Sequence, residues 1–288
     1  MFARRGYLLE VSDRMPNRRV AEELVDILAA HGYNELFLLG EGELALPSPR
    51  FGAYCEMQGI ELALLDRGRG DALLADGGTV AVASERARSL AGRVERMRER
   101  MAAAETAGRA RRARRFLVTD FADGYAWAPP VVSLPAIVLG GNFAMSGAQA
   151  AKMDLERALN RVLGANVGGL LLRLGTLYLR GGAVHEDESE LFRILAHDHG
   201  YSRHPGMTDH VLEDIGAVAE GVRILIERSA AENEWAAEIA YAAMLIEAAA
   251  HRRDERRLLA LRAEHSRLWR LRAEDAGRAE SLARLPRF

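Results

Sequence analysis

Five short apolar runs in the first 120 residues constrain the fold of this chain more than any other feature. Each run has five or six residues and is apolar enough to be buried on both faces, as strands of a parallel sheet are. The runs are Tyr7–Val11, Glu35–Leu39, Ile60–Leu65, Thr79–Ala83 and Arg115–Thr119. Helical apolar spacing at Asn17–His31 and Arg86–Gly108 predicts parallel strands joined by right-handed crossovers, with Asn17 as a helix N-cap and Gly32 as a left-handed C-terminal cap.

After Ser146 the strand pattern stops and helical spacing takes over. The predicted helical segments are Gln149–Val162, Leu170–Leu179, Glu188–Ala196, Thr208–Arg228, Ala230–His251 and Arg256–Leu285. Thr208 is a candidate N-cap directly after the Pro205-Gly206 break. The change of period predicts an α/β domain at residues 1–147 and an all-α helical domain at residues 148–288.

Composition excludes several classes of function. The net charge of −2 argues against a general attraction to nucleic acid or to an anionic membrane, so neither is an expected partner. Cys55 is the only cysteine, which excludes an intrachain disulfide and a multi-cysteine metal site and fits a reducing compartment. The N-terminus lacks the pattern of a secretory signal, and no run is judged long enough to span a bilayer, so a cytoplasmic location is expected.

Six segments resemble one enzyme family, and they occur in the order that the family has. They are Arg5–Ser12 (RGYLLEVS), Gly32–Leu38 (GYNELFL), Gly59–Leu62 (GIEL), Phe116–Gly124 (FLVTDFADG), Glu264–Trp269 (EHSRLW) and Ser281–Leu285 (SLARL). The chain resembles the bacterial β-N-acetylhexosaminidases of glycoside hydrolase family 20, in their first, second, third and eighth barrel strands and in their helical C-terminal domain. The resemblance implies an incomplete TIM-barrel-like parallel β/α domain of about five strands in the order 3-2-1-5-4, followed by an all-α domain.

The catalytic segment of that family is missing. Its acid/base chemistry uses an adjacent Asp-Glu pair after the fourth strand, but only twelve residues separate Asp66 from Thr79. Three strand–helix units need on the order of 90 residues. The only Asp-Glu pairs, Asp187-Glu188 and Asp254-Glu255, lie in the helical half and are interpreted as surface charge or charge at helix N-termini. We therefore expect a degenerate, non-catalytic relative that keeps part of a carbohydrate-binding cleft and needs no cofactor.

The resemblance assigns sugar-binding roles to several residues. Arg5 and Asp123 match residues that hold sugar hydroxyls, although a structural Arg–Asp ion pair would explain them as well. Phe121 and Trp127 are candidates for stacking on a sugar face, with simple packing as the alternative. Asp120 and Glu41 complete the predicted amino-sugar site, and Glu41 is also explained as a solvated loop acid.

Two alternatives remain open from the sequence. One is an active glycoside hydrolase whose acid is relocated to Glu41, Asp66 or a partner chain, and the other is a structural, oligomerising interaction protein. An arc that lacks three strands exposes two edges and an apolar face, which the C-terminal helices or a second chain would cover, and we expect a homodimer. The loop histidines with their neighbouring acids, His197, His199, His204 and His210 with Asp198 and Asp209, match no defined metal motif, so no metal is expected.

Overall fold

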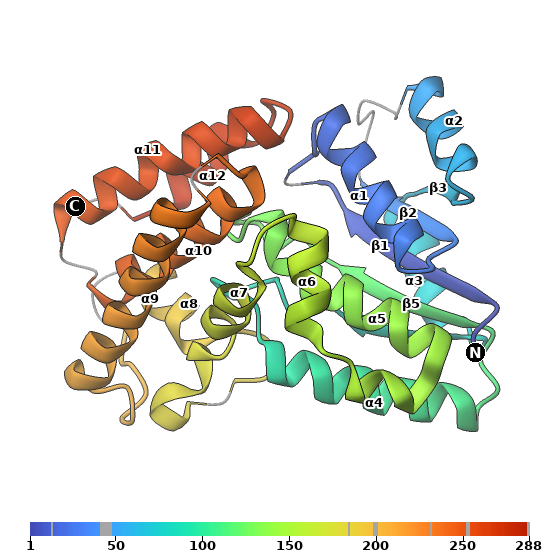
Figure 1. Ribbon diagram of the computed structural model, residues 1–288, viewed down its shortest axis with the longest axis horizontal. Coiled ribbons are helices and arrows are strands. Elements are labelled where there is room, and N and C mark those ends of the chain that lie inside the picture. Colours follow the sequence, from blue (N-terminus) through green and yellow to red (C-terminus); the bar gives the residue numbers. More distant parts are fainter. Residues whose placement is uncertain are drawn as a thin grey trace.

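The computed structural model describes residues 1–12, 14–40, 48–183, 185–197, 201–230, 232–251 and 254–286. Five parallel strands form one sheet in the order β3-β2-β1-β5-β4 (Figure 1). The strands are β1 (Arg4–Glu10), β2 (Glu35–Leu39), β3 (Glu61–Leu65), β4 (Thr79–Ala83) and β5 (Arg115–Asp120). The predicted strands, their parallel direction and their order are confirmed. The sheet ends at β3 and β4, so an open α/β sheet is observed and not a closed barrel.

Four helices of the first half pack on one face of the sheet. They are α1 (Arg18–Ala30), α2 (Pro49–Met57), α4 (Val94–Ala110) and α5 (Leu134–Ser146), and their buried residues share one apolar core with that face. Asn17 caps α1 by accepting a hydrogen bond from the Val20 amide, and Gly32 follows with a φ of 76°, as predicted.

The opposite face of the sheet is covered by α3 (Arg67–Ala75), which joins β3 to β4. The steps from β1 to β2, from β2 to β3 and from β4 to β5 all run in one direction across the sheet, whereas the step from β3 to β4 runs back across its whole width. A right-handed crossover in the reverse direction must pass over the other face. Leu73 and Leu74 of α3 accordingly pack against a separate cluster formed by Leu8, Phe37, Leu39 and Leu117. Neither the C-terminal helices nor a second chain is needed to provide this cover.

The helices of the first half differ from the prediction in two ways. The helix expected from Arg86 begins only at Val94, because Arg88 and Gly92 have φ values of 49° and 82°, which a right-handed helix cannot contain. Helices α2, α3 and α5 lie in segments for which no helix was predicted.

In the second half, the regular elements among the described residues are helices. They are α6 (Leu155–Leu163), α7 (Gly168–Leu174), α8 (Glu190–Ala196), α9 (Asp209–Ser229), α10 (Glu234–Ala250), α11 (Glu255–Arg272) and α12 (Arg278–Arg284), with short 3₁₀ turns at Gly147–Lys152 and Leu177–Gly182; a further 3₁₀ turn at Pro130–Ser133 precedes α5 in the first half. Thr208 caps α9 as predicted. The last predicted helix is divided in two, because the chain after Arg272 is extended and pairs with the loop before α1 through the Glu274 amide and the Met15 carbonyl, 2.9 Å apart.

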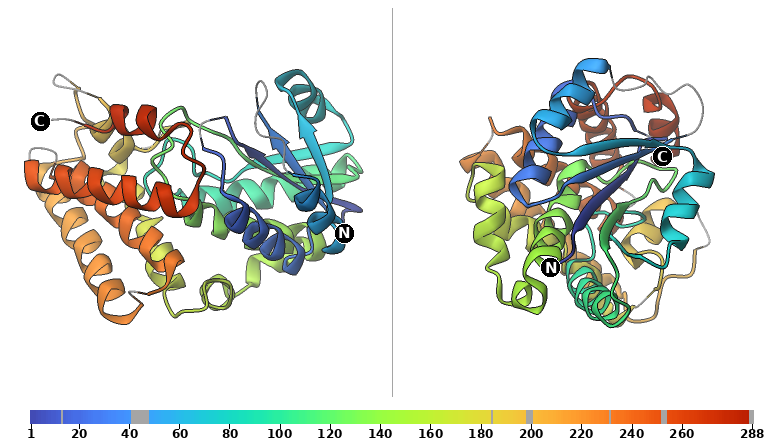
Figure 2. Two further views of the ribbon diagram at one scale, coloured as in Figure 1. Left: turned by 90° about the horizontal axis from the view of Figure 1, so that it is seen from above. Right: turned by 90° about the vertical axis from the view of Figure 1, so that its right-hand side faces the viewer.

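The two halves lie side by side along the long axis of the molecule (Figures 1 and 2), and one apolar core runs through both. The predicted boundary coincides with the end of α5 at Gly147, but Val118 of the sheet, Leu159 of α6 and Ile239 of α10 belong to the same buried cluster. Contrary to the sequence expectation, the segment Pro130–Lys152 has the length and hydropathy of a membrane span, the only such single helix in the described part of the chain. It lies mostly inside the core.

Candidate functional site

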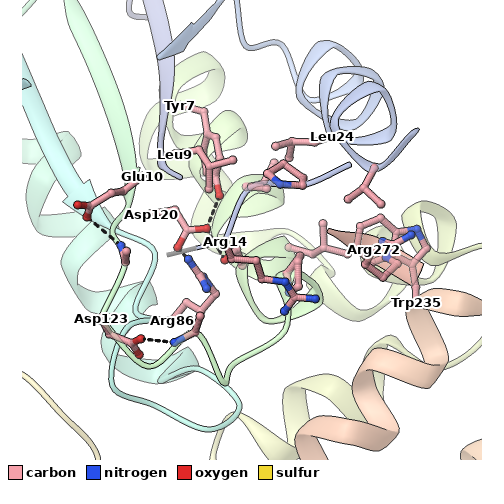
Figure 3. Close-up of a pocket in the computed structure, with 18 residues that line it drawn as sticks. Tyr7, Leu9, Glu10, Arg14, Leu24, Arg86, Asp120, Asp123, Trp235 and Arg272 are labelled. Carbon is pink, nitrogen blue, oxygen red and sulfur yellow. Dashed lines mark hydrogen bonds and ion pairs between the residues drawn. The ribbon is translucent and has the colours of Figure 1, made fainter. Parts of the chain in front are cut away.

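The carboxyl ends of the parallel strands face the helical half, and a pocket opens between them (Figure 3). Leu9 of β1 is in register with Asp120 of β5, so the carboxyl ends of these neighbouring strands meet at one edge. We call this space the inner pocket; its volume is about 60 Å³. The residues that line it are Tyr7, Leu9, Glu10, Arg14, Pro16, Val20, Leu24, Arg86, Asp120, Ala122, Asp123, Ala126, Pro130, Ser133, Leu134, Ile137, Trp235 and Arg272.

Asp120 is the centre of a buried hydrogen-bond network at the wall of the inner pocket. One carboxylate oxygen, Oδ2, accepts from the hydroxyls of Tyr7 and Ser133 at 2.7 and 2.8 Å. The other, Oδ1, accepts from the Ser84 hydroxyl at 2.9 Å and from Nε of Arg86 at 2.8 Å. An ionised carboxylate accepts about four hydrogen bonds, so Asp120 is fully satisfied within the protein. Burial, followed by the nearby Asp120 carboxylate, raises the pKa of Tyr7 well above its ordinary value.

Arg272 forms the opposite wall of the inner pocket. Its guanidinium pairs with Glu238 at 2.8 Å, with Glu23 at 2.9 Å and with Glu234 at 3.0 Å. It also lies 4.1 Å from the ring centre of Trp235. Since these partners come from α1 and α10, this buried network joins the two halves of the chain behind the pocket.

Arg14 is the third arginine of the inner pocket, and its situation differs from that of the other two. Its guanidinium lies 4.9 Å from the ring centre of Trp269, and within the described residues it makes no hydrogen bond or ion pair. Figure 3 shows it between the Asp120–Arg86 pair and the Trp235–Arg272 wall. Burial lowers the pKa of Arg14, and the charge of Glu238 offsets only part of that effect.

A second, larger space shares Glu10 and Ala122 with the lining of the inner pocket, and we call it the outer cleft. Its volume is about 530 Å³. Its lining comprises Glu10, Ser12, Leu39, Arg67, Gly70, Asp71, Leu74, Phe121, Ala122 and Gly124. The side chain of Glu10 is fixed there, because one oxygen accepts from the Ala122 amide at 3.0 Å and the other is 3.2 Å from a nitrogen of Arg67.

Arg5 and Asp123 were expected to act together, and the structure separates them. Arg5 lies near the start of β1, where its guanidinium donates to the carbonyls of Gly32 and Phe2, away from the cleft. Asp123 lines the inner pocket and accepts from the amides of Arg88 and Ala126, both at 2.9 Å. The alternative Arg5–Asp123 ion pair is therefore not formed; the buried Arg–Asp pair of this site is Arg86–Asp120.

The other predicted residues divide between the cleft and the core. Phe121 lines the outer cleft. Trp127 is buried against Tyr125 and Phe192, so it packs in the core, as the alternative to stacking on a sugar face had it. Asp66 caps α3 through the Arg69 amide. Glu41 lies outside the described residues.

Two sequence features outside the cleft have structural explanations. Asp254 caps α11, which agrees with its interpretation as charge at a helix N-terminus. No cluster of metal-ligating side chains occurs among the residues that the structure describes, a set that excludes Asp198 and His199. The ring of His204 accepts a hydrogen bond from the Gly206 amide at 3.2 Å.

The fold and site define an α/β protein with a ligand-sized cleft at the carboxyl edge of a parallel sheet, beside a smaller pocket that helices from later in the chain close on one side. In comparisons with known proteins, no family model matches this chain and no curated protein matches it.

Proposed function

We propose that this protein binds a small hydroxylated ligand of the amino-sugar class in the outer cleft and does not hydrolyse it. The observation that carries the proposal is the cleft itself, whose volume of about 530 Å³ lies within the range of small-molecule sites. It combines the carboxylates of Glu10 and Asp71 and the guanidinium of Arg67 with the aromatic ring of Phe121. Charged groups suit sugar hydroxyls and an aromatic ring suits the apolar face of a sugar.

The surroundings of the carboxyl groups support the proposal that the ligand is not hydrolysed. A general acid must be a carboxyl group that is withdrawn from water and keeps its proton. Asp120, Asp123 and Glu10 each accept hydrogen bonds from the protein through both oxygens. Asp71 is exposed. Each of these four carboxyl groups is thus either engaged by donors of the protein or open to solvent.

Titration calorimetry with N-acetylglucosamine tests the binding. We expect a dissociation constant on the order of millimolar, because an open cleft buries little of the ligand. Phe121→Ala and Asp71→Asn should each weaken binding about fivefold or more, by removing a stacking face or a charged acceptor. Asp214→Asn, an equivalent change at an exposed position on α9, should leave the affinity unchanged.

An assay with 4-nitrophenyl N-acetyl-β-glucosaminide tests the second half of the proposal, and we expect no release of nitrophenol above the uncatalysed rate. Turnover by the purified protein would instead support the alternative of an active glycosidase with a relocated acid. Absence of binding heat with any hexose or hexosamine would remove the sugar-binding function.

A further inference from the structure

The loop that carries Arg14 is fixed in place by the distant end of the chain. Glu274 donates its amide to the Met15 carbonyl at 2.9 Å, and Asn17 donates its amide to the Arg272 carbonyl at 3.2 Å. Arg14 directly precedes the first of these anchors, so the backbone beside it is held next to the inner pocket.

The guanidinium of Arg14 offers donors that the described chain does not use. An arginine has five N–H donors, and a donor that is buried without a partner lowers stability. Nε of Arg14 is buried and unbonded, and the face of Trp269 provides only a cation–π contact. By contrast, Arg86 is paired with Asp120, and Arg272 is paired with three glutamates.

The acidic groups that line the inner pocket already have their own donors. Asp120 is paired with Arg86, Glu10 with Arg67, and Asp123 accepts from backbone amides. The remaining walls are largely apolar, with Leu24, Leu134 and Ile137 among them. In such surroundings the charge of Arg14 is weakly screened, so it attracts an anion more strongly than an arginine in water would.

The size of the inner pocket limits what it can receive. A volume of about 60 Å³ holds a few water molecules or one small group, but not a sugar ring. The inner pocket and the outer cleft share Glu10 and Ala122 in their linings, so the site that we infer places the ring of a ligand in the cleft and its substituent beside Arg14.

We infer that the ligand carries an anionic substituent, a carboxylate or a phosphate, which the inner pocket receives on Arg14. A sugar acid or a sugar phosphate therefore fits the whole site better than a neutral sugar. The assignment of the sugar part rests on the proposed function, whereas the anion site rests on Arg14.

Calorimetry with matched ligands tests this inference. Glucose and glucuronate differ only in the group at C6, and glucose 6-phosphate distinguishes a phosphate from a carboxylate. We expect an anionic sugar to bind the wild type at least about tenfold more tightly than glucose, as one charge-assisted bidentate contact allows. In Arg14→Gln the ratio of the affinity for the anionic sugar to the affinity for glucose should be close to one. Arg18→Gln, at an exposed position on α1, should leave this ratio unchanged.

The possible results separate the two proposals. If glucose binds but the preference for anionic sugars is absent or survives in Arg14→Gln, the inference is wrong and the sugar cleft stands. If no sugar binds but acetate or phosphate raises the melting temperature of the wild type and not of Arg14→Gln, the anion site stands and the sugar cleft falls. If no ligand has any effect, both fall.

The stability of the ligand-free protein gives an independent measurement. If Arg14 serves a ligand, Arg14→Met removes a charge that has no ion-pair partner within the described residues, and the melting temperature should stay the same or rise. A fall of several degrees would show that Arg14 has a structural role and would overturn the inference.

Discussion

Asp120 shows, at the scale of a single residue, how a strand-end acid can be structural. A carboxylate at the end of the last strand predicts a sugar site. The four acceptor positions of Asp120 are, however, occupied by Tyr7, Ser84, Arg86 and Ser133. Its role is to hold the ends of β1 and β5 and the following loop together.

Asp120→Asn is expected to destabilise the protein by about 3–5 kcal/mol, because it leaves Arg86 buried without its counter-charge. The double variant Asp120→Asn/Arg86→Met should regain part of that loss. Asp66→Asn is the control, since Asn caps a helix about as well as Asp, and it should cost less than about 0.5 kcal/mol. Urea unfolding of the variants measures these changes. If Asp66→Asn and Asp120→Asn lower the free energy of unfolding equally, the structural role of Asp120 is contradicted.

His265 is a second buried polar residue whose state follows from its neighbours. The Ser281 hydroxyl donates to the Tyr125 carbonyl at 2.5 Å, so it accepts from Nε2 of His265 at 3.0 Å. The Tyr241 hydroxyl then donates to Nδ1 at 2.6 Å. Burial lowers the pKa of His265 to about 3, and the ring is therefore neutral over most of the pH range.

This neutral histidine makes stability depend on pH. Between about pH 6.5 and 3 the unfolded chain binds a proton at His265 and the folded chain does not, so stability falls as the pH falls. The loss should reach roughly 3 kcal/mol at pH 4. His265→Gln should be less stable at pH 7 but should show a shallower decline between pH 6.5 and 4. His210→Gln, at a site that is 83% exposed, should keep the slope of the wild type in urea unfolding at several pH values.

At the scale of the elements, α5 lies against the end of α1 at a distance that requires glycine. A Cβ atom on Gly141 would lie 2.2 Å from the carbonyl oxygen of His31, which is backbone and cannot rotate away. Gly141→Ala is therefore expected to cost about 3 kcal/mol or more. Gly52→Ala in α2, where no atom lies within 4 Å of the added carbon, should stabilise the protein by about 0.5–1 kcal/mol. If thermal melts show that the two substitutions change the melting temperature in the same direction, this packing is contradicted.

The strands could be predicted from the sequence because each is a compact apolar run, and the resemblance supplied their order. Helix α5 could not, because it is buried on nearly all sides and lacks the polar face from which a helical period is recognised. Helix α3 was missed for the opposite reason, since it contains two glycines and only Leu73 and Leu74 pack inward.

The candidate site was predictable only where it follows the strands. Phe121 and Asp123 come directly after β5, and the structure places both at the carboxyl edge. Arg14 was missed because a single arginine in a loop forms no pattern, and its surroundings are provided by Trp235 and Trp269, more than 200 residues later in the chain. Arg5 lies at the beginning of β1, and the direction of the strand carries it away from the cleft.

At the scale of the whole molecule, the two open edges of the sheet motivate the proposal of a homodimer. The edge strand β3 is partly exposed, and Leu64 on it is 38% exposed. An uncovered apolar edge favours pairing with a second copy. We expect light scattering at micromolar concentration to give twice the mass of the chain and Leu64→Lys to give a monomer. A monomeric wild type would exclude the dimer.

The passage of α3 across the sheet has a consequence for how the molecule opens. Leu65 ends β3 and Thr79 begins β4, so one short connection ties together the two strands that lie furthest apart in the sheet. Edge strands usually fray independently, because each is held by a single neighbour. Here the loss of either strand also detaches α3 from the apolar cluster of Leu8, Phe37, Leu39 and Leu117. Strands β3 and β4 should therefore unfold together, as one cooperative unit. Backbone amides of β3 and β4 should then exchange with deuterium at the same free energy, although four strand spacings separate them.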